Sequence, residues 1–174
     1  RIVNYSSGDG TDKLIFQYTV QEGDTSSDLD YVDANSLALN SGTIKDAAGN
    51  AATLTLVTAG ASGSIGAAEA IVIDTTVPTV SISTVMTDDI VDASEDEAVV
   101  VAGTSTGAVG ETVTVTLSDG SNTAVQKTAE VQANGSWTTS ASVADISGFN
   151  NGPVQVSAEV SDLAGNAATT ATRT

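Results

Sequence analysis

The sequence predicts an all-β protein made of two tandem antiparallel β-sandwich modules, and three observations lead to this fold class. Apolar and polar residues alternate along several segments, two dipeptides typical of tight turns lie beside such segments, and one octapeptide occurs in two nearly identical copies. Period-two alternation is typical of half-buried antiparallel strands. No segment has apolar residues at helical spacing over a useful length, so we expect no long helix.

The alternation is clearest in three segments, residues 14–20, 112–117 and 154–160. In each of them Val, Leu, Ala or aromatic residues occupy every second position, and the residues between them are Thr, Ser, Gln or Glu, apart from Ile15. The dipeptides Asp119-Gly120 and Asn134-Gly135 are flanked by strand-like runs and predict hairpin turns. Short strands separated by such turns favour a sandwich.

The repeated octapeptide predicts duplicated modules. Asp46-Ala-Ala-Gly-Asn-Ala-Ala-Thr53 recurs with one substitution as Asp162-Leu-Ala-Gly-Asn-Ala-Ala-Thr169. Between the copies, Pro78 lies in a Thr-rich extended stretch, where a proline can begin a strand. We therefore place the module boundary in this linker, with modules at residues 1–74 and 75–174.

The second module has the length and strand count of a complete immunoglobulin-like sandwich. Its seven strands are expected near residues 80–84, 98–104, 112–118, 124–131, 137–142, 154–161 and 167–173. Trp137, the single tryptophan, follows a predicted turn and is expected to fill the core. The first module has about five strand signals in 74 residues, so we expect it to lack its N-terminal strands.

Composition excludes several classes of function. The net charge of -17 repels nucleic-acid phosphates and anionic lipid, and favours cations as partners; solubility alone is the other explanation of this charge. The chain has no Cys and no His, which removes disulfides, thiolate zinc sites and the usual general base. No apolar run reaches the length of a membrane span, and the chain reads as an internal fragment of a longer protein.

Several motifs together resemble a known family. They are the linker Asp74-Thr-Thr-Val-Pro78, the two Asp-x-Ala-Gly-Asn loops, Asp88-Asp-Ile-Val-Asp-Ala-Ser-Glu95, Gly135-Ser-Trp137, Gly10-Thr-Asp-Lys-Leu14, Tyr18-Thr-Val-Gln-Glu-Gly-Asp24 and Thr43-Ile-Lys-Asp46. In order and spacing they resemble the bacterial immunoglobulin-like repeats of giant repeats-in-toxin (RTX) adhesins secreted by type I systems. The resemblance covers nearly the whole chain.

The resemblance implies an extracellular location on the bacterial cell surface and a role as a calcium-stiffened extender in biofilm formation or host-cell attachment. It also implies that neighbouring repeats of the same chain are the direct partners, while a distant host or surface ligand is bound through other domains. Neither nucleic acid nor membrane insertion is expected. The glycine-aspartate nonapeptides of that family are absent here, so export is inferred from the resemblance alone.

One predicted calcium site lies at the module junction. In a seven-strand sandwich the loop before the last strand lies at the end where the chain enters, which should bring Asp162 near Asp74 and Glu111. Calcium needs six to eight oxygen ligands, so carboxylates must converge from several loops. The alternative is that Asp162 caps a turn around Gly165 with its side chain, and both can hold together. Asp46 is the counterpart of Asp162 and is included among the predicted ligands.

A second acidic loop contains four carboxylates within eight residues, Asp88, Asp89, Asp92 and Glu95. Such carboxylates repel one another unless a cation or solvent relieves them, so calcium is one interpretation. The other is that Asp92-x-x-Glu95 forms a capping box for one helical turn. The site would be at the far end of its module, where a following repeat could complete it.

A third acidic cluster, Asp24, Asp28, Asp30 and Asp33, is interpreted first as a solvated loop, with a cation site as the alternative. The spacing is not that of an EF-hand, because the Asp-x-Asp-x-Asp-Gly order and the terminal Glu are missing.

Three classes of function follow from these patterns. The first is a non-catalytic spacer stiffened by calcium. The second is a module that binds a glycan, a peptide or ice; aromatic residues make up only 3% of the chain, which disfavours sugar stacking unless Tyr5, Tyr31 or Trp137 is exposed. The third is an enzyme, which we do not expect, because nothing in the sequence indicates a carboxylic acid with a raised pKa or a substrate cleft.

Overall fold

The computed structural model describes residues 1–174 and divides them into two compact units, residues 1–75 (unit 1) and residues 76–174 (unit 2). The fold is all-β, as predicted, with eleven strands in antiparallel sheets. Helical structure is limited to α1 (Ile65–Ala68) and the 3-10 turn η1 (Thr139–Ala141). Neither has the length and hydropathy that crossing a membrane requires.

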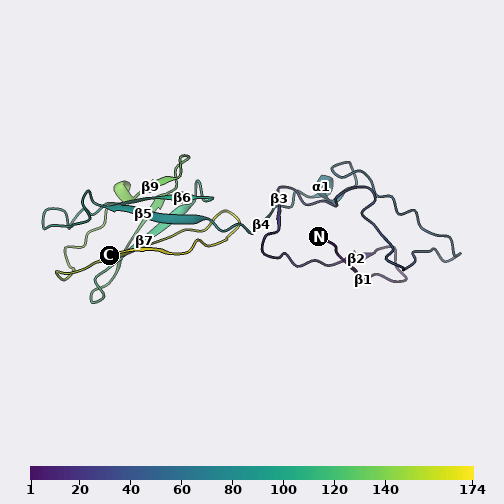
Figure 1. Ribbon diagram of the computed structural model, residues 1–174, viewed down its shortest axis with the longest axis horizontal. Coiled ribbons are helices and arrows are strands. Elements are labelled where there is room, and N and C mark those ends of the chain that lie inside the picture. The colour runs from purple at the N-terminus through teal and green to yellow at the C-terminus, as the bar shows by residue number, and fades with distance from the viewer. The chain divides into compact units, whose positions relative to one another are not determined.

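Unit 2 contains seven strands in two antiparallel sheets (Figure 1). One sheet has the order β5-β6-β9 and the other the order β11-β10-β7-β8. The strands are β5 (Thr79–Val85), β6 (Val101–Thr106), β7 (Thr112–Ser118), β8 (Val125–Glu130), β9 (Ser136–Thr138), β10 (Gln155–Glu159) and β11 (Ala171–Arg173). All seven strands expected in the second half of the chain are present, although β9, β10 and β11 are at least three residues shorter than predicted.

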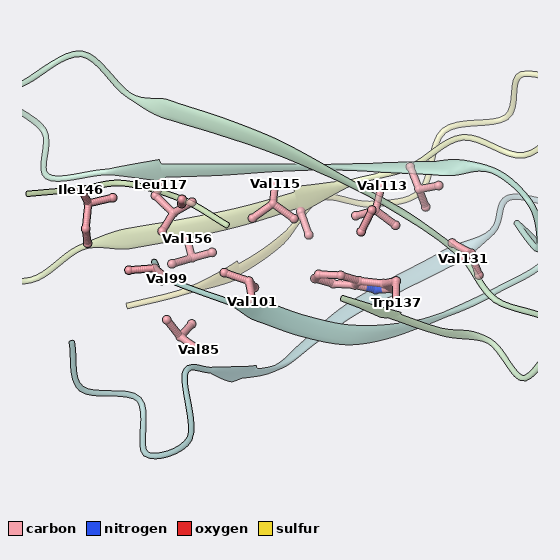
Figure 2. Close-up of a cluster of buried hydrophobic side chains, with 14 of the residues drawn as sticks. Val85, Val99, Val101, Val113, Val115, Leu117, Val131, Trp137, Ile146 and Val156 are labelled. Carbon is pink, nitrogen blue, oxygen red and sulfur yellow. The ribbon is translucent and has the colours of Figure 1, made fainter. Parts of the chain in front are cut away.

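The core of unit 2 lies between its two sheets. The alternation along β7 buries Val113, Val115 and Leu117, each at most 1% exposed, while the intervening Thr residues are partly exposed. Figure 2 shows these side chains on one side of the core and Val101 and Trp137 on the other. Burial of this branched aliphatic surface is the main source of stability that the sequence pattern can supply.

Trp137 fills the core, as predicted, and is 1% exposed. Its strand β9 pairs with β6, and Trp137 lies opposite Gly103. A Cβ atom at Gly103 would lie 1.9 Å from the Ser81 carbonyl oxygen and 2.4 Å from Cζ2 of Trp137. The indole ring therefore requires a glycine on the neighbouring strand.

The two predicted hairpin turns have different outcomes. Asp119-Gly120 begins the connection between β7 and β8, which pair with each other, so this hairpin is confirmed. Asn134-Gly135 forms a tight turn, but it connects β8 of one sheet to β9 of the other, so the hairpin prediction is wrong there. Dipeptide chemistry specifies the local turn, whereas strand pairing depends on which residues meet across the core.

Unit 1 contains two sheets of two short strands each. β1 (Tyr5–Ser7) pairs with β2 (Ile15–Phe16), and β3 (Thr25–Ser26) pairs with β4 (Ile73–Asp74). The strand expected over residues 14–20 is present only as β2, because residues 17–20 have no partner strand to form a ladder. No apolar side chain of unit 1 is buried, and Ser64 is the buried residue there.

Candidate cation-binding loops

The two copies of the octapeptide form the same turn. In each copy Oδ1 of the Asp accepts the backbone N–H of the Asn four residues later, at 2.8 Å for both Asp46 and Asp162. The Asn side chain donates from Nδ2 to Oδ2 of the Asp, at 2.8 Å from Asn50 and 2.9 Å from Asn166. The Gly between them has a φ of +89° in both copies, a backbone conformation that glycine adopts without strain.

These hydrogen bonds favour the charged form of each carboxyl group. The Asn50 side chain, followed by the backbone of the loop, lowers the pKa of Asp46, and the Asn166 side chain does the same for Asp162. The side-chain-to-backbone turn proposed as the alternative for Asp162 is therefore present. Both carboxylates already have hydrogen-bond donors, but each oxygen retains lone-pair capacity toward a cation.

A surface hollow of about 520 Å³ in unit 2 brings together two of the predicted ligands, Glu111 and Asp162. Glu111 precedes β7, and Asp162 follows β10, which pairs with β7. Glu159 also lines this hollow and accepts a hydrogen bond from the Thr170 hydroxyl at 3.1 Å. Sequence reasoning missed Glu159, although its place on the outward face of the alternating segment 154–160 was a usable signal.

The acidic loop at residues 88–95 has two separate sets of contacts. Asp89 accepts the Val85 N–H at 3.0 Å and pairs with the Arg173 guanidinium, and these bonds lower its pKa, with the Val85 bond first. Asp92 accepts the N–H of Ser94 at 2.7 Å, while its own N–H points to Oε2 of Glu95 at the long distance of 3.5 Å.

The same loop therefore has the outline of the predicted capping box, with a single turn after Asp92. The backbone N–H groups of Glu95 and Asp96 donate to the Asp92 carbonyl at 3.0 Å and 3.1 Å. Asp88 accepts the Ile90 N–H at 3.1 Å. A cap of this kind and a cation are compatible only where carboxylate lone pairs remain accessible.

In unit 1 the acidic residues hold loops together. The hydrogen bond from the Tyr18 hydroxyl, then those from Gln21 and Arg1, lower the pKa of Asp24 to about 2. Desolvation opposes the ionisation of Asp30. Hydrogen bonds that include the one from the Gly60 N–H at 2.9 Å nevertheless lower the pKa of Asp30 to about 2. The cluster interpreted as a solvated loop thus makes specific contacts within its unit.

Sequence reasoning also missed Asp119, a carboxylate with four hydrogen-bond donors. It accepts the N–H groups of Ser121 and Asn122 at 3.0 Å and 2.8 Å, the Asn122 side chain at 2.7 Å, and the Asn150 N–H at 2.8 Å. These bonds, led by that from the Asn122 backbone, hold its pKa well below the usual range. The Asp-Gly dipeptide indicated the turn, but nothing in the sequence pointed to Asn150.

No group of three acidic side chains is arranged in the structure to hold a metal ion. Asp74 lies in β4 of unit 1, whereas Glu111 and Asp162 belong to unit 2, and the structure describes each unit by itself. Calcium also takes carbonyl and water oxygens, so two or three carboxylates can contribute to its shell without completing it. The predicted calcium ligands accordingly remain predictions.

Comparisons with known proteins gave one structural match. No family model and no curated protein matches the chain. A solved structure described as a tetra-tandem repeat in the extending region of a large adhesion protein is 30% identical, with a TM-score of 0.46. The match covers 59% of this chain and 25% of that chain, so the present chain spans about a quarter of it.

Proposed function

We propose that this chain is a non-catalytic extender segment of a bacterial cell-surface adhesin, in which tandem modules are stiffened by calcium. The observation that carries the proposal is the octapeptide turn, which recurs with the same hydrogen bonds in two separate units. Repetition of one structural element is typical of arrays whose modules act by length and spacing. The order of the motifs along the sequence supports the extracellular adhesin setting.

Calcium is the cofactor that the acidic surface best suits. Glu111, Glu159 and Asp162 line one hollow, and their charges repel one another unless a cation or solvent compensates them. Extracellular calcium modules typically have dissociation constants of roughly 0.1 to 1 mM, so such a site would be filled outside the cell. Carbonyl groups, water and a carboxylate from the linker would supply the remaining ligands.

We expect calcium to raise the melting temperature more than sodium chloride does at equal ionic strength, because specific coordination stabilises the folded state by mass action. The measurement is thermal unfolding of the whole chain in calcium and in chelator. Glu111→Gln should reduce the calcium-dependent shift. Glu130→Gln removes the same charge from a residue that does not line the hollow, and should leave the shift unchanged. Equal melting curves in calcium and chelator would remove the calcium proposal.

The proposal extends to the junction, where Asp74 is expected to join the same calcium shell as Asp162. Asp74 is exposed in β4, so replacing it should leave each unit folded. Small-angle scattering in calcium should show a broader distribution of lengths for Asp74→Ala than for the wild type. Glu69→Ala, which removes an exposed carboxylate outside the linker, is the matched control. Identical scattering profiles for the wild type and Asp74→Ala would show that this carboxylate does not stiffen the junction.

A ligand-binding module is the second candidate, and the exposed aromatic pair of unit 1 is the observation that favours it. Tyr5 is 42% exposed and Phe16 44% exposed, and their rings meet edge to face with centroids 6.2 Å apart. Exposed rings of this kind can stack on a sugar. Titration with soluble oligosaccharides, comparing the wild type with Tyr5→Ala, tests this candidate.

A further inference from the structure

Two Asn-Gly dipeptides occur in unit 2, and the structure places them in different surroundings. They are Asn134-Gly135, in the turn before β9, and Asn151-Gly152, in the loop before β10. In an Asn-Gly sequence the glycine amide nitrogen can attack the carboxamide carbon of the preceding Asn with little hindrance, because glycine has no side chain. Whether it does so depends on the freedom of both groups.

Both reacting groups of Asn134-Gly135 are held. The Gly135 N–H donates to the Gln132 carbonyl at 2.8 Å, and the Gly135 carbonyl accepts the Ser105 N–H at 2.8 Å. Oδ1 of Asn134 accepts both the N–H and the hydroxyl of Ser136, at 3.0 Å and 2.7 Å. Attack at this site would require breaking hydrogen bonds on both sides of the reacting bond.

Neither reacting group of Asn151-Gly152 is held. The Gly152 N–H and the Asn151 carboxamide make no hydrogen bond within the protein, and both residues are exposed. On the preceding side, Asn150 is anchored to Asp119 at 2.8 Å. On the following side, Pro153 has no N–H to join a ladder. The dipeptide is thus a free bend between an anchored residue and the beginning of β10.

We propose that Asn151-Gly152 is a site of spontaneous deamidation in the folded protein and that Asn134-Gly135 is protected. The Gly152 nitrogen loses its proton to solvent and bonds to Cγ of Asn151. The carboxamide nitrogen takes up a proton from solvent, its bond to Cγ breaks, and ammonia leaves. Water then opens the five-membered succinimide at either carbonyl. The products are aspartate or isoaspartate at position 151, with no change in oxidation state.

The modification adds charge to an acidic surface. Asn151 and Gly152 line a hollow of about 420 Å³, together with Asp89, Asp92 and Asp96. Each event replaces a neutral amide by a carboxylate at that rim. Where isoaspartate forms, the backbone also gains one methylene group just before β10, so the loop is lengthened as well as charged.

Incubation of the whole chain at mildly alkaline pH, followed by peptide mapping with mass spectrometry, tests the proposal. We expect the mass increase of one amide-to-acid exchange, mapped to Asn151. The modified residue should accumulate at least about tenfold faster at position 151 than at position 134, because the turn at Asn134 must first open its hydrogen bonds. Isoaspartate should be detected at the same position. In denaturant the two sites should react at similar rates, since the turn that protects Asn134 is then absent.

Two variants provide the controls. Asn151→Gln should abolish most of the ammonia release, because its longer side chain would form a less favourable six-membered ring. Asn134→Gln should leave the release unchanged. The proposal is overturned if modification maps first to Asn134, if neither site reacts in the folded chain while both react in denaturant, or if Asn151→Gln releases ammonia at the wild-type rate.

Discussion

Unit 1 and unit 2 each contain one copy of the octapeptide turn, but they differ in their cores. Eight residues are enough to specify the turn, whereas a buried core requires a whole sandwich. The octapeptide turn has the same hydrogen bonds in both units. In unit 2 it connects β10 to β11, within a pair of sheets that enclose buried side chains from Val85 to Val160 along the chain. In unit 1 the strands are two or three residues long, and no apolar side chain is buried. A turn whose hydrogen bonds join its own residues therefore forms both with and without a buried core beside it.

The apolar residues of unit 1 are present but are not enclosed. Leu14, Phe16 and Val20 are 41%, 44% and 45% exposed, although they are apolar positions of the most regular alternation in the first half of the chain. Two-stranded sheets bury little surface, and independent stability needs more strands or a packed second layer.

The largest expected difference between the units comes from a matched pair of leucines. Leu117 is 1% exposed and Leu14 is 41% exposed. Leu117→Ala should lower the free energy of unfolding of unit 2 by about 3 kcal/mol, because it removes buried methyl groups and leaves a cavity. Leu14→Ala should cost less than about 1 kcal/mol. Denaturant titration of the whole chain measures both, and an equal cost would mean that Leu14 is enclosed in solution.

Much of unit 2 could be predicted because its information is local and periodic. Alternation along residues 112–117 identified β7 and its buried face, and the Asp-Gly dipeptide identified the turn that follows it. Pairing between distant strands was not accessible, which is why the Asn134-Gly135 turn was assigned to a hairpin. It connects two sheets because β9 pairs with β6.

The candidate site was predictable to a similar degree. Strand order placed Glu111 and Asp162 at one end of a sandwich, and both line the same hollow. The partners of individual carboxylates depend on chain segments far apart in sequence, such as Asp119 with Asn150 and Asp89 with Arg173. Sequence spacing carries no information on such pairs.

A smaller effect is expected from removing the Asn side chain of each octapeptide turn. Asn166→Ala should lower the free energy of unfolding of unit 2 by about 1 kcal/mol, because Asp162 is only 8% exposed and water replaces the lost donor poorly. Asn50→Ala should cost a few tenths of a kcal/mol, because Asp46 is exposed to water. Thermal or denaturant unfolding distinguishes the two; a larger cost at Asn50 would show that the first copy is buried in solution.

The last expected difference between the units is the pH response of the unit 1 carboxylates. Asp24 and Asp30 have a pKa of about 2, whereas an unfolded Asp has a pKa of roughly 3.9. The unfolded chain therefore binds more protons between these values, so the stabilisation is present above about pH 4 and is lost as the pH falls toward 2.

Carboxyl-carbon NMR titration measures this response directly at each residue. The midpoint of Asp24 should rise toward the ordinary value in Tyr18→Phe, because the Tyr18 hydroxyl is the largest cause of its low pKa, and should rise less in Arg1→Gln, because Arg1 contributes after Tyr18 and Gln21. Asp30, whose partners include Gly60 and Ser64, should not respond to either variant and serves as the internal control. A midpoint for Asp24 near 4 in the wild type would mean that the residue 18–24 loop is open in solution. The hydrogen bonds of unit 1 would then need an enclosed core, as those of unit 2 have, before they could form.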